Sequence, residues 1–315
     1  MTDNQSNQER LITDLILNGK QGRTWGEIAY AHNIKSHGSP EQRRKAANDI
    51  WRKHLRSLEV SSEAPKVYKP KRLFYDIETS YNLVKSWRIG FNLNLNMDDI
   101  IQERAIITIA YKWEGEEDVT VLSWDKGCDK KIIEDFVKVM ADADELVGHN
   151  LDRYDTKFIM TRALKHNISV LPKYQSTDTL KLAKKHFMLN SNKLDYIAQY
   201  LGIGHKTKHR GLEMWDDIIL RNDEKALEEM IEYNVQDVFL TEKVYTKLME
   251  YSIPKVNHQV LTGEGKCGCP ECGSKEATLV KTYATAAGTK SRLMNCNSCK
   301  INYTLSESKY KKQYG

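Results

Sequence analysis

Long apolar segments are missing from this chain of 315 residues. A transmembrane helix requires about 20 consecutive, mainly apolar residues, so the sequence excludes a helical membrane protein. The first ten residues, MTDNQSNQER, also lack the basic-then-apolar pattern of a secretory signal. We therefore expect a cytoplasmic protein that has no membrane partner.

Cysteine is also scarce, with six residues in the chain. Four of them form two CxxC pairs, in the segments CGCPECG and CNSCK. Disulfides are rare in reducing compartments, where paired CxxC motifs typically bind metal. The spacing therefore favours a metal site over the alternative, a redox-active CxxC.

The net charge is only +5, but the charges are unevenly distributed. Residues 1–72 contain 14 Lys or Arg against 8 Asp or Glu, and residues 263–315 contain 9 against 4. The centre, residues 73–262, is acidic, with 25 against 31. Basic ends around an acidic centre suit a protein that holds nucleic acid at its periphery and binds cations in the middle. The alternative is that the ends are lysine-rich for solubility alone.

Residues 1–62 show the apolar spacing of three short helices. Thr24 is a predicted N-cap, and Ser39, Pro40 and Glu41 predict another helix start. Three helices with a basic third one resemble a helix-turn-helix or winged-helix module; the alternative is a protein-docking module. In a DNA-binding module, the phosphate contacts would be Arg43, Arg44, Lys45, Arg52 and Lys53.

Two prolines and the lack of periodicity predict a linker at residues 63–71. Residues 72–258 then alternate strand and helix patterns, which predicts an α/β domain with a mixed sheet flanked by helices. The predicted strands are 72–78, 105–113, 118–124 and 145–150. The predicted helices are 130–141, 153–167, 178–187, 193–201 and 225–250.

The first of these strands, in the segment RLFYDIETS, carries two acids, Asp76 and Glu78. Side chains alternate between the faces of a strand, so both carboxylates project from one face. Burying unpaired charge is costly, which indicates either a divalent-cation site or a strand end where both acids meet water or basic residues. Further along, GHNLDRYDTKFI places Asp155 at a helix start, and IEYNVQDVFL places Tyr233 and Asp237 on one helix face.

Three ordered motifs in these segments resemble the DEDD, or DnaQ-like, superfamily of 3′–5′ exonucleases. Its D-x-E motif is matched by DIE, its N-x3-[FY]-D motif by NLDRYD, and the Y-x3-D motif of its tyrosine subclass by YNVQD. The resemblance covers about residues 72–250. It is strongest to the proofreading domains of family B polymerases and to YprB-like proteins, many of them phage-encoded. It implies a ribonuclease-H-like fold. It also implies a protein of the cytoplasm of a bacterium or of a phage-infected host cell.

The resemblance also implies a hydrolase that releases nucleoside 5′-monophosphates from 3′ ends. Two Mg²⁺ or Mn²⁺ ions would hold the attacking and leaving oxygens. Tyr233 would orient the attacking water, because a phenol with a pKa near 10 is a poor base at neutral pH. The implied ligands of the ions are Asp76, Glu78, Asp155 and Asp237.

The expected partner is nucleic acid, DNA in preference to RNA, and a replication or repair protein is a further candidate. Substrate contacts are predicted at Asn150 and, in the basic loop GHKTKHRG, at Lys206, Lys208 and Arg210. For the loop, a solvated surface is the alternative. Two other functions fit the same motifs: a structure-specific endonuclease or resolvase, and a DNA-binding protein without catalytic activity.

Residues 263–305 resemble a zinc ribbon, followed by a basic tail at 306–315. Four thiolates in two knuckles suit one structural Zn²⁺ in a domain too small for a core of its own. The preferred ligands are Cys269, Cys272, Cys296 and Cys299, with Cys267 as an alternative because CGC offers two registers. Tyr283 and Tyr303 are expected to be available to nucleic acid, and partner docking is the alternative role of this segment.

Overall fold

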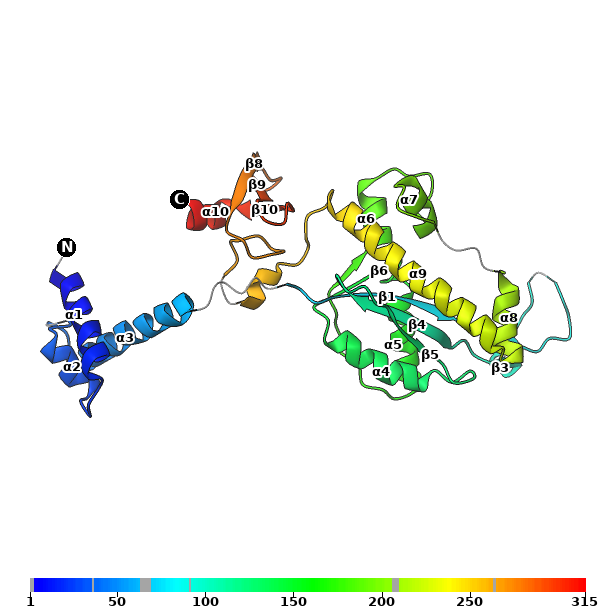
Figure 1. Cartoon of the computed structure of the whole chain (residues 1–315), viewed down its shortest axis with the longest axis horizontal. Helices are drawn as coiled ribbons and strands as arrows, with labels where there is room; N and C mark the ends of the chain where they lie inside the picture. The colour runs from blue at the N-terminus through cyan, green and yellow to red at the C-terminus, as the bar shows by residue number, and fades with distance from the viewer. Residues whose placement is uncertain (1–2, 36, 63–68, 91, 206–209, 263–264) are drawn as a thin grey trace. The chain divides into compact units, whose positions relative to one another are not determined.

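The computed structural model describes residues 3–35, 37–62, 69–90, 92–205, 210–262 and 265–315 (Figure 1). Contacts between Cα atoms divide the chain into two units, Met1–Val67 and Tyr68–Gly315. Most of the predicted linker, residues 63–68, lies outside the described residues. In the described ranges, no helix is long and apolar enough to cross a bilayer.

The first unit contains three helices, α1 (Asp3–Asn18), α2 (Trp25–Ala31) and α3 (Pro40–Ser62). Thr24 is the N-cap of α2, as predicted, because its side chain accepts from the Glu27 amide while the Glu27 carboxylate accepts from the Thr24 amide. The core of this unit consists of six buried apolar residues, namely Leu11, Leu15, Ile28, Ala29, Ile34 and Ala47.

The segment between α2 and α3, residues 32–39, is longer than the three- or four-residue turn of a helix-turn-helix motif. Arg44 and Arg52 are exposed on α3, and Arg43 donates from Nε to the Gly38 carbonyl at 2.8 Å. The role of these arginines in DNA binding stays a prediction.

The second unit is built on a five-stranded sheet with the order β5-β4-β1-β6-β7. The strand β1 is central; it pairs antiparallel with β4 and parallel with β6. β5 pairs antiparallel with β4, and β7 pairs parallel with β6. The strands are β1 (Arg72–Thr79), β4 (Ile106–Trp113), β5 (Thr120–Ser123), β6 (Glu145–Gly148) and β7 (Ser176–Asp178).

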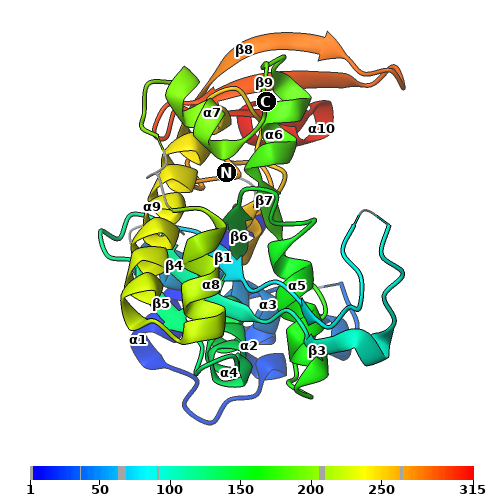
Figure 2. The same ribbon diagram turned by 90° about the vertical axis from the view of Figure 1, so that its right-hand side faces the viewer.

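Helices cover both faces of this sheet (Figures 1 and 2). On one face, Tyr75 and Ile77 of β1 pack with Phe136 and Ile159 in the largest apolar core. On the other face, Phe74 packs with residues of the long helix α9, which contacts β4, β1 and β6. The helices are α4 (Lys130–Ala141), α5 (Asp155–Lys165), α6 (Thr179–His186), α7 (Leu194–Tyr200), α8 (Leu212–Arg221) and α9 (Glu224–Met249).

The prediction of a mixed sheet flanked by helices is confirmed. The helix predicted at 130–141 coincides with α4, whereas the predictions included neither α8 nor the short strand β7. A small excursion after β1 contains β2 (Leu83–Val84), the 3-10 helix η1 (Met97–Asp99) and β3 (Ile100–Gln102), and β2 pairs antiparallel with β3.

The carboxyl-terminal segment forms a three-stranded sheet with the order β10-β9-β8. Tyr303, expected at the surface, is 1% exposed and packs in the core of this lobe, so that expectation was wrong; Tyr283 is 37% exposed. The predicted basic tail contains a helix, α10. The elements are the 3-10 helix η2 (His258–Thr262), β8 (Ala277–Ala284), β9 (Lys290–Cys296), β10 (Asn302–Ser306) and α10 (Glu307–Tyr314).

A buried arginine at the start of β1 links this lobe to the central sheet. Arg72 pairs with Glu145 at 2.7 Å, with Glu114 at 3.0 Å and with Glu271 at 2.6 Å. Burial would raise the pKa of Glu145, but a hydrogen bond from His258 and the charge of Arg72 lower that pKa to about 2. Three carboxylates from distant segments therefore compensate for burial of one guanidinium group.

Candidate functional site

Asp76 and Glu78 lie in the second half of β1 and, by alternation, share the face of the sheet that carries Phe74. Phe74 packs there against Val238 and Tyr245 of α9, so both acids face the helix. The pairing of β1 with β4 shifts register between Glu78 and the next residue. A bulge of this kind increases local twist and re-aims side chains, and it is found often beside active sites.

The helix α9 contributes a third acid to this position. One carboxylate oxygen from each of Asp76, Glu78 and Asp237 lies within 4.8 Å of the other two. Two oxygens that share one Mg²⁺ lie at most about 4.2 Å apart, so small side-chain rotations suffice to bring these three onto shared cations. Tyr233 is half-buried one helical turn before Asp237. Residues that are far apart in the sequence therefore form one acidic cluster, and this donor set fits divalent cations.

Asp155, the first residue of α5, is 5% exposed and lies outside that three-residue cluster. Its carboxylate accepts hydrogen bonds from its own amide and from the backbone amide of Ile77, the residue between Asp76 and Glu78. Asp155 is thus in contact with the strand that carries the first two acids. Burial raises the pKa of Asp155 to about 7, aided by the charge of Asp178 and opposed by those two hydrogen bonds.

Asn150 forms the turn that follows β6. Its φ of 66° lies in the left-handed region, which asparagine tolerates better than most residues. The backbone amide of Asn150 donates to Oδ1 of Asp178 at 2.9 Å, and the same oxygen accepts from the backbone amide of Leu180 at 2.9 Å. Asp178 thereby caps α6 and also fixes the backbone of the turn that leads to Asp155.

Two side chains, from Tyr154 and Trp215, hold the end of β1 at Thr79. Its hydroxyl is 2.8 Å from the hydroxyl of Tyr154, the aromatic residue of the second motif. Nε1 of Trp215, on α8, donates to the Thr79 carbonyl at 3.0 Å. These contacts fix β1 on the far side of the bulge, so the direction of Glu78 is set from both ends of the strand.

Asn234 was not among the predicted site residues. It lies on α9 between Tyr233 and Asp237 and is fully buried. Its Nδ2 donates to Oδ2 of Asp76 at 2.8 Å. The only signal available in the sequence was its place inside the third motif, because its partner is 158 residues away.

A hollow of about 630 Å³ opens beyond the ends of β6 and β7. Both strands run parallel with β1, so their carboxyl ends lie at the same edge of the sheet as Glu78. His149 forms part of the wall and is fixed by contacts with Thr179 Oγ1 at 2.9 Å and the Asn192 carbonyl at 3.0 Å. Exposed cations line the hollow, namely Arg153, Lys184 and Lys193, together with Asn150 and Asp195.

The predicted basic loop is only partly described, because Lys206 and Lys208 lie outside the described residues. Arg210 is half-exposed and forms ion pairs with Asp217 at 2.9 Å and with Glu229 at 3.0 Å. A phosphate contact by Arg210 would therefore compete with these two carboxylates.

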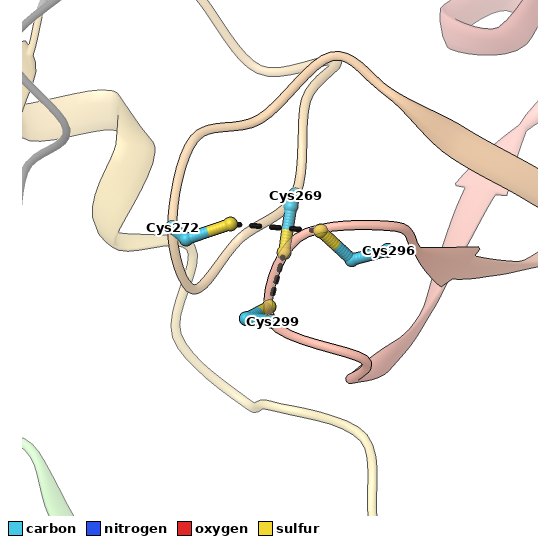
Figure 3. Close-up of side chains that lie close together, drawn as sticks. All are labelled: Cys269, Cys272, Cys296 and Cys299. Atoms are coloured by element: carbon cyan, nitrogen blue, oxygen red, sulfur yellow. Dashed lines mark hydrogen bonds between the residues drawn. The ribbon is translucent and has the colours of Figure 1, made fainter.

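The four predicted zinc ligands converge in the carboxyl-terminal lobe (Figure 3). Cys269 Sγ lies 3.5 Å from Cys299 Sγ, and Cys272 Sγ lies 3.5 Å from Cys296 Sγ. Thiolates around tetrahedral Zn²⁺ are about 3.8 Å apart, since each Zn–S bond is about 2.3 Å long. The hydrogen bond from Cys269 lowers the pKa of Cys299 to about 5, so one thiolate forms readily. The cluster fits a small zinc ribbon, and Cys267 is not part of it.

Comparison with protein families agrees with this architecture. Residues 99–249 match the model RNase_H_2, which describes the RNase_H superfamily. The central fold is ribonuclease-H-like. The match contains Asp155, Tyr233 and Asp237 but begins after β1, so Asp76 and Glu78 lie outside it.

Among solved structures, the chain is similar to a family B DNA polymerase from the hyperthermophilic archaeon Pyrobaculum calidifontis. The identity is 18% and the TM-score is 0.46. The alignment covers 58% of this chain and 25% of the polymerase, so the chain spans a quarter of that protein. A search of curated proteins found no match.

The raised pKa of Asp155 predicts a pH-dependent stability in buffer without Mg²⁺ or Mn²⁺. The folded state keeps the Asp155 proton up to about pH 7, whereas the unfolded chain loses it near the ordinary value of 3.8. The free energy of unfolding should therefore fall as the pH rises from 5 to 7, by at most about 1.4 kcal/mol per pH unit from this residue. Urea unfolding of the wild type and of Asp155→Asn at pH 5, 6, 7 and 8 measures the difference.

The Asp155→Asn variant should lack this component, while Asp118→Asn, at an exposed acid between β4 and β5, should keep it. Parallel pH profiles for the wild type and Asp155→Asn would show that the carboxyl of Asp155 titrates normally.

The cysteine cluster predicts one bound zinc ion per chain. Metal analysis of purified protein by inductively coupled plasma mass spectrometry should find it, and Cys272→Ser or Cys296→Ser should abolish it, since a structural site uses all four thiolates. Cys267→Ser and Cys128→Ser are matched controls that should retain the metal. Loss of zinc in Cys267→Ser but not in Cys269→Ser would establish the other register.

Proposed function

We propose that this protein is a metal-dependent 3′–5′ exonuclease that hydrolyses nucleic acid, with DNA as the favoured substrate. The observation that carries the proposal is the convergence of Asp76, Glu78 and Asp237 within 4.8 Å. Three carboxylates at this separation repel one another unless cations or protons compensate for their charge. The ribonuclease-H-like fold supports a nuclease in general, and the Tyr233 motif supports the exonuclease in particular.

Divalent cations, when bound, polarise the scissile phosphate and lower the pKa of water, as Mg²⁺ and Mn²⁺ do in nucleases. Asp76, Glu78 and Asp237 would hold them. Asp155 would join this set after giving up the proton that its raised pKa retains in their absence. Tyr233 would orient the attacking water through its hydroxyl group.

The hollow lined by Arg153, Lys184 and Lys193 is the proposed path of the substrate strand. It opens at the edge of the sheet that carries the acids, and its cations match the charge of a phosphodiester backbone. Asn150 lines the hollow and also begins the turn that leads to Asp155, which suits a residue that fixes this turn and contacts the substrate.

The flanking regions have separate proposed roles. Residues 1–62 would bind duplex DNA, and residues 263–305 would form a zinc ribbon around Cys269, Cys272, Cys296 and Cys299. Residues 72–258 would form the catalytic domain. A replication or repair protein is a candidate partner of the whole chain.

Hydrolysis of end-labelled nucleic acids tests the proposed activity. With Mg²⁺ or Mn²⁺, 5′-labelled single-stranded DNA should shorten stepwise from its 3′ end. Asp76→Asn and Asp237→Asn should each lower the rate at least about 100-fold, because cation stabilisation is worth several kcal/mol and each 1.36 kcal/mol is a factor of ten. Asp118→Asn serves as the control and should be fully active.

The same assay separates the alternatives. A closed circular substrate should remain intact, and its nicking would indicate an endonuclease or resolvase. Binding without turnover in the presence of either cation would indicate a silent binding protein. Full activity of Asp76→Asn would contradict the proposed site. The rates of hydrolysis of a DNA and an RNA substrate of the same sequence, measured under the same conditions, show which nucleic acid the protein prefers.

The proposed strand path predicts a change in salt dependence. Lys184→Gln with Lys193→Gln should weaken binding of single-stranded DNA, and the slope of log affinity against log salt concentration should fall by about 1.4, at about 0.7 per lost phosphate contact. Fluorescence anisotropy without divalent cations measures this in the absence of turnover. Lys130→Gln with Lys138→Gln, on α4, is the matched control; an equal change there would show a non-specific charge effect.

A further inference from the structure

The Asn234 side chain connects three elements of the acidic cluster. It projects from α9, and its Nδ2 donates to Oδ2 of Asp76 on β1 at 2.8 Å. Its Oδ1 accepts from the hydroxyl of Thr108 on β4 at 3.1 Å. Thr108 in turn is the residue paired with Glu78 across the β1–β4 ladder.

The Asp76 carboxylate, which only accepts, determines which way the Asn234 amide faces, and the Thr108 hydroxyl holds the other end of the amide. Both side chains are 0% exposed, so their polar groups must be satisfied inside the protein. The Thr108 hydroxyl donates to the carbonyl oxygen of the amide, and this leaves the amino group directed at Asp76. The opposite orientation would place the carbonyl oxygen against the Asp76 carboxylate, and two acceptors in contact would repel.

The chemistry of this donor also suits a cation site. Asn234 is neutral, so it fixes Asp76 without compensating for its charge, whereas a lysine or arginine there would compete with a bound cation. The contact is made to one carboxylate oxygen, Oδ2 of Asp76. Partners of metal-binding carboxylates that orient them in this way are worth about 10- to 100-fold in metal affinity or activity.

We propose that Asn234 is a positioning residue that orients the Asp76 carboxylate for divalent-cation binding, with Thr108 holding the carbonyl end of the Asn234 amide. This inference rests on the proposed function, because it assigns a role within the same site. Asn234 acts through Asp76 and does not contact the substrate.

Binding of Mn²⁺ alone to the zinc-loaded full chain tests the inference. Electron paramagnetic resonance measures free Mn²⁺ during the titration. Asn234→Ala should raise the dissociation constant about 10- to 100-fold, because Asp76 is no longer held. Thr108→Val should raise the dissociation constant by a smaller factor, because the Asn234 amide then loses its hydrogen bond from Thr108 but keeps the one to Asp76.

Kinetics give a second readout. The turnover of Asn234→Ala should be lowest at limiting Mn²⁺ and should recover in part at saturating Mn²⁺, with the KM for DNA unchanged. Thr241→Ala controls for packing loss, because Thr241 is 2% exposed on the same helix. It should alter stability but leave the Mn²⁺ titration as in the wild type.

The outcomes separate the inference from the function on which it rests. Wild-type Mn²⁺ affinity in a folded Asn234→Ala or Thr108→Val protein, with DNA hydrolysis intact, overturns the inference and leaves the exonuclease standing. Failure of the wild type itself to bind Mn²⁺ or to cleave overturns both. If Asn234→Ala does not fold, the Thr108→Val titration decides.

Discussion

Electrostatic repulsion among Asp76, Glu78 and Asp237 is the constraint on which the rest of the structure depends. The three carboxylates approach within 4.8 Å of one another between β1 and α9, where Asp237 is buried and Asp76 and Glu78 are half-buried. Water compensates for their charge only in part at such a position. Such an arrangement is stable only if a rigid frame enforces it. The central strand β1 supplies that frame, since it is paired on both sides and packed between α9 and the helices of the opposite face.

The acids of the central domain, buried or half-buried, are held in two different ways. Asp129 and Glu145 are compensated by cations: Arg162 lies 2.6 Å from Asp129, and Arg72 lies 2.7 Å from Glu145. These pairs tie elements of the fold together. Asp76, by contrast, accepts a hydrogen bond from a neutral amide, and Asp155 accepts two from backbone amides. A neutral donor fixes the direction of a carboxylate without adding a positive charge, so these contacts differ in kind from the ion pairs of Asp129 and Glu145.

The sequence allowed the acids to be predicted because each motif is local: two residues on one strand, one at a helix start and one a turn after Tyr233. The same locality explains α4, whose amphipathic pattern is regular. The features that the sequence did not predict depend on contacts between residues that are far apart in the chain. The strand β7 has three residues, too few to show alternation, and its neighbour β6 is about 30 residues earlier. Asn234 and Thr108 are 126 residues apart, and neither has a pattern that indicates the other. The sequence around Tyr303 gives no sign that its ring is buried, because the ring packs against Cys269 and Cys296 from other segments of the chain.

The position of Glu271 connects the cysteine cluster to the central strand β1. Glu271 lies between Cys269 and Cys272, so the geometry of the knuckle determines where its carboxylate sits. That carboxylate contacts both terminal nitrogens of Arg72, at 2.6 Å each, on the first residue of β1. Arg72 is 3% exposed, and removing one of its partners would leave buried positive charge only partly compensated. The conformation of the cysteine knuckle therefore affects the stability of the first residue of β1 through the ion pair between Glu271 and Arg72. This contact attaches the lobe at the end of β1 opposite the bulge and so leaves the carboxyl edge of the sheet open to a substrate.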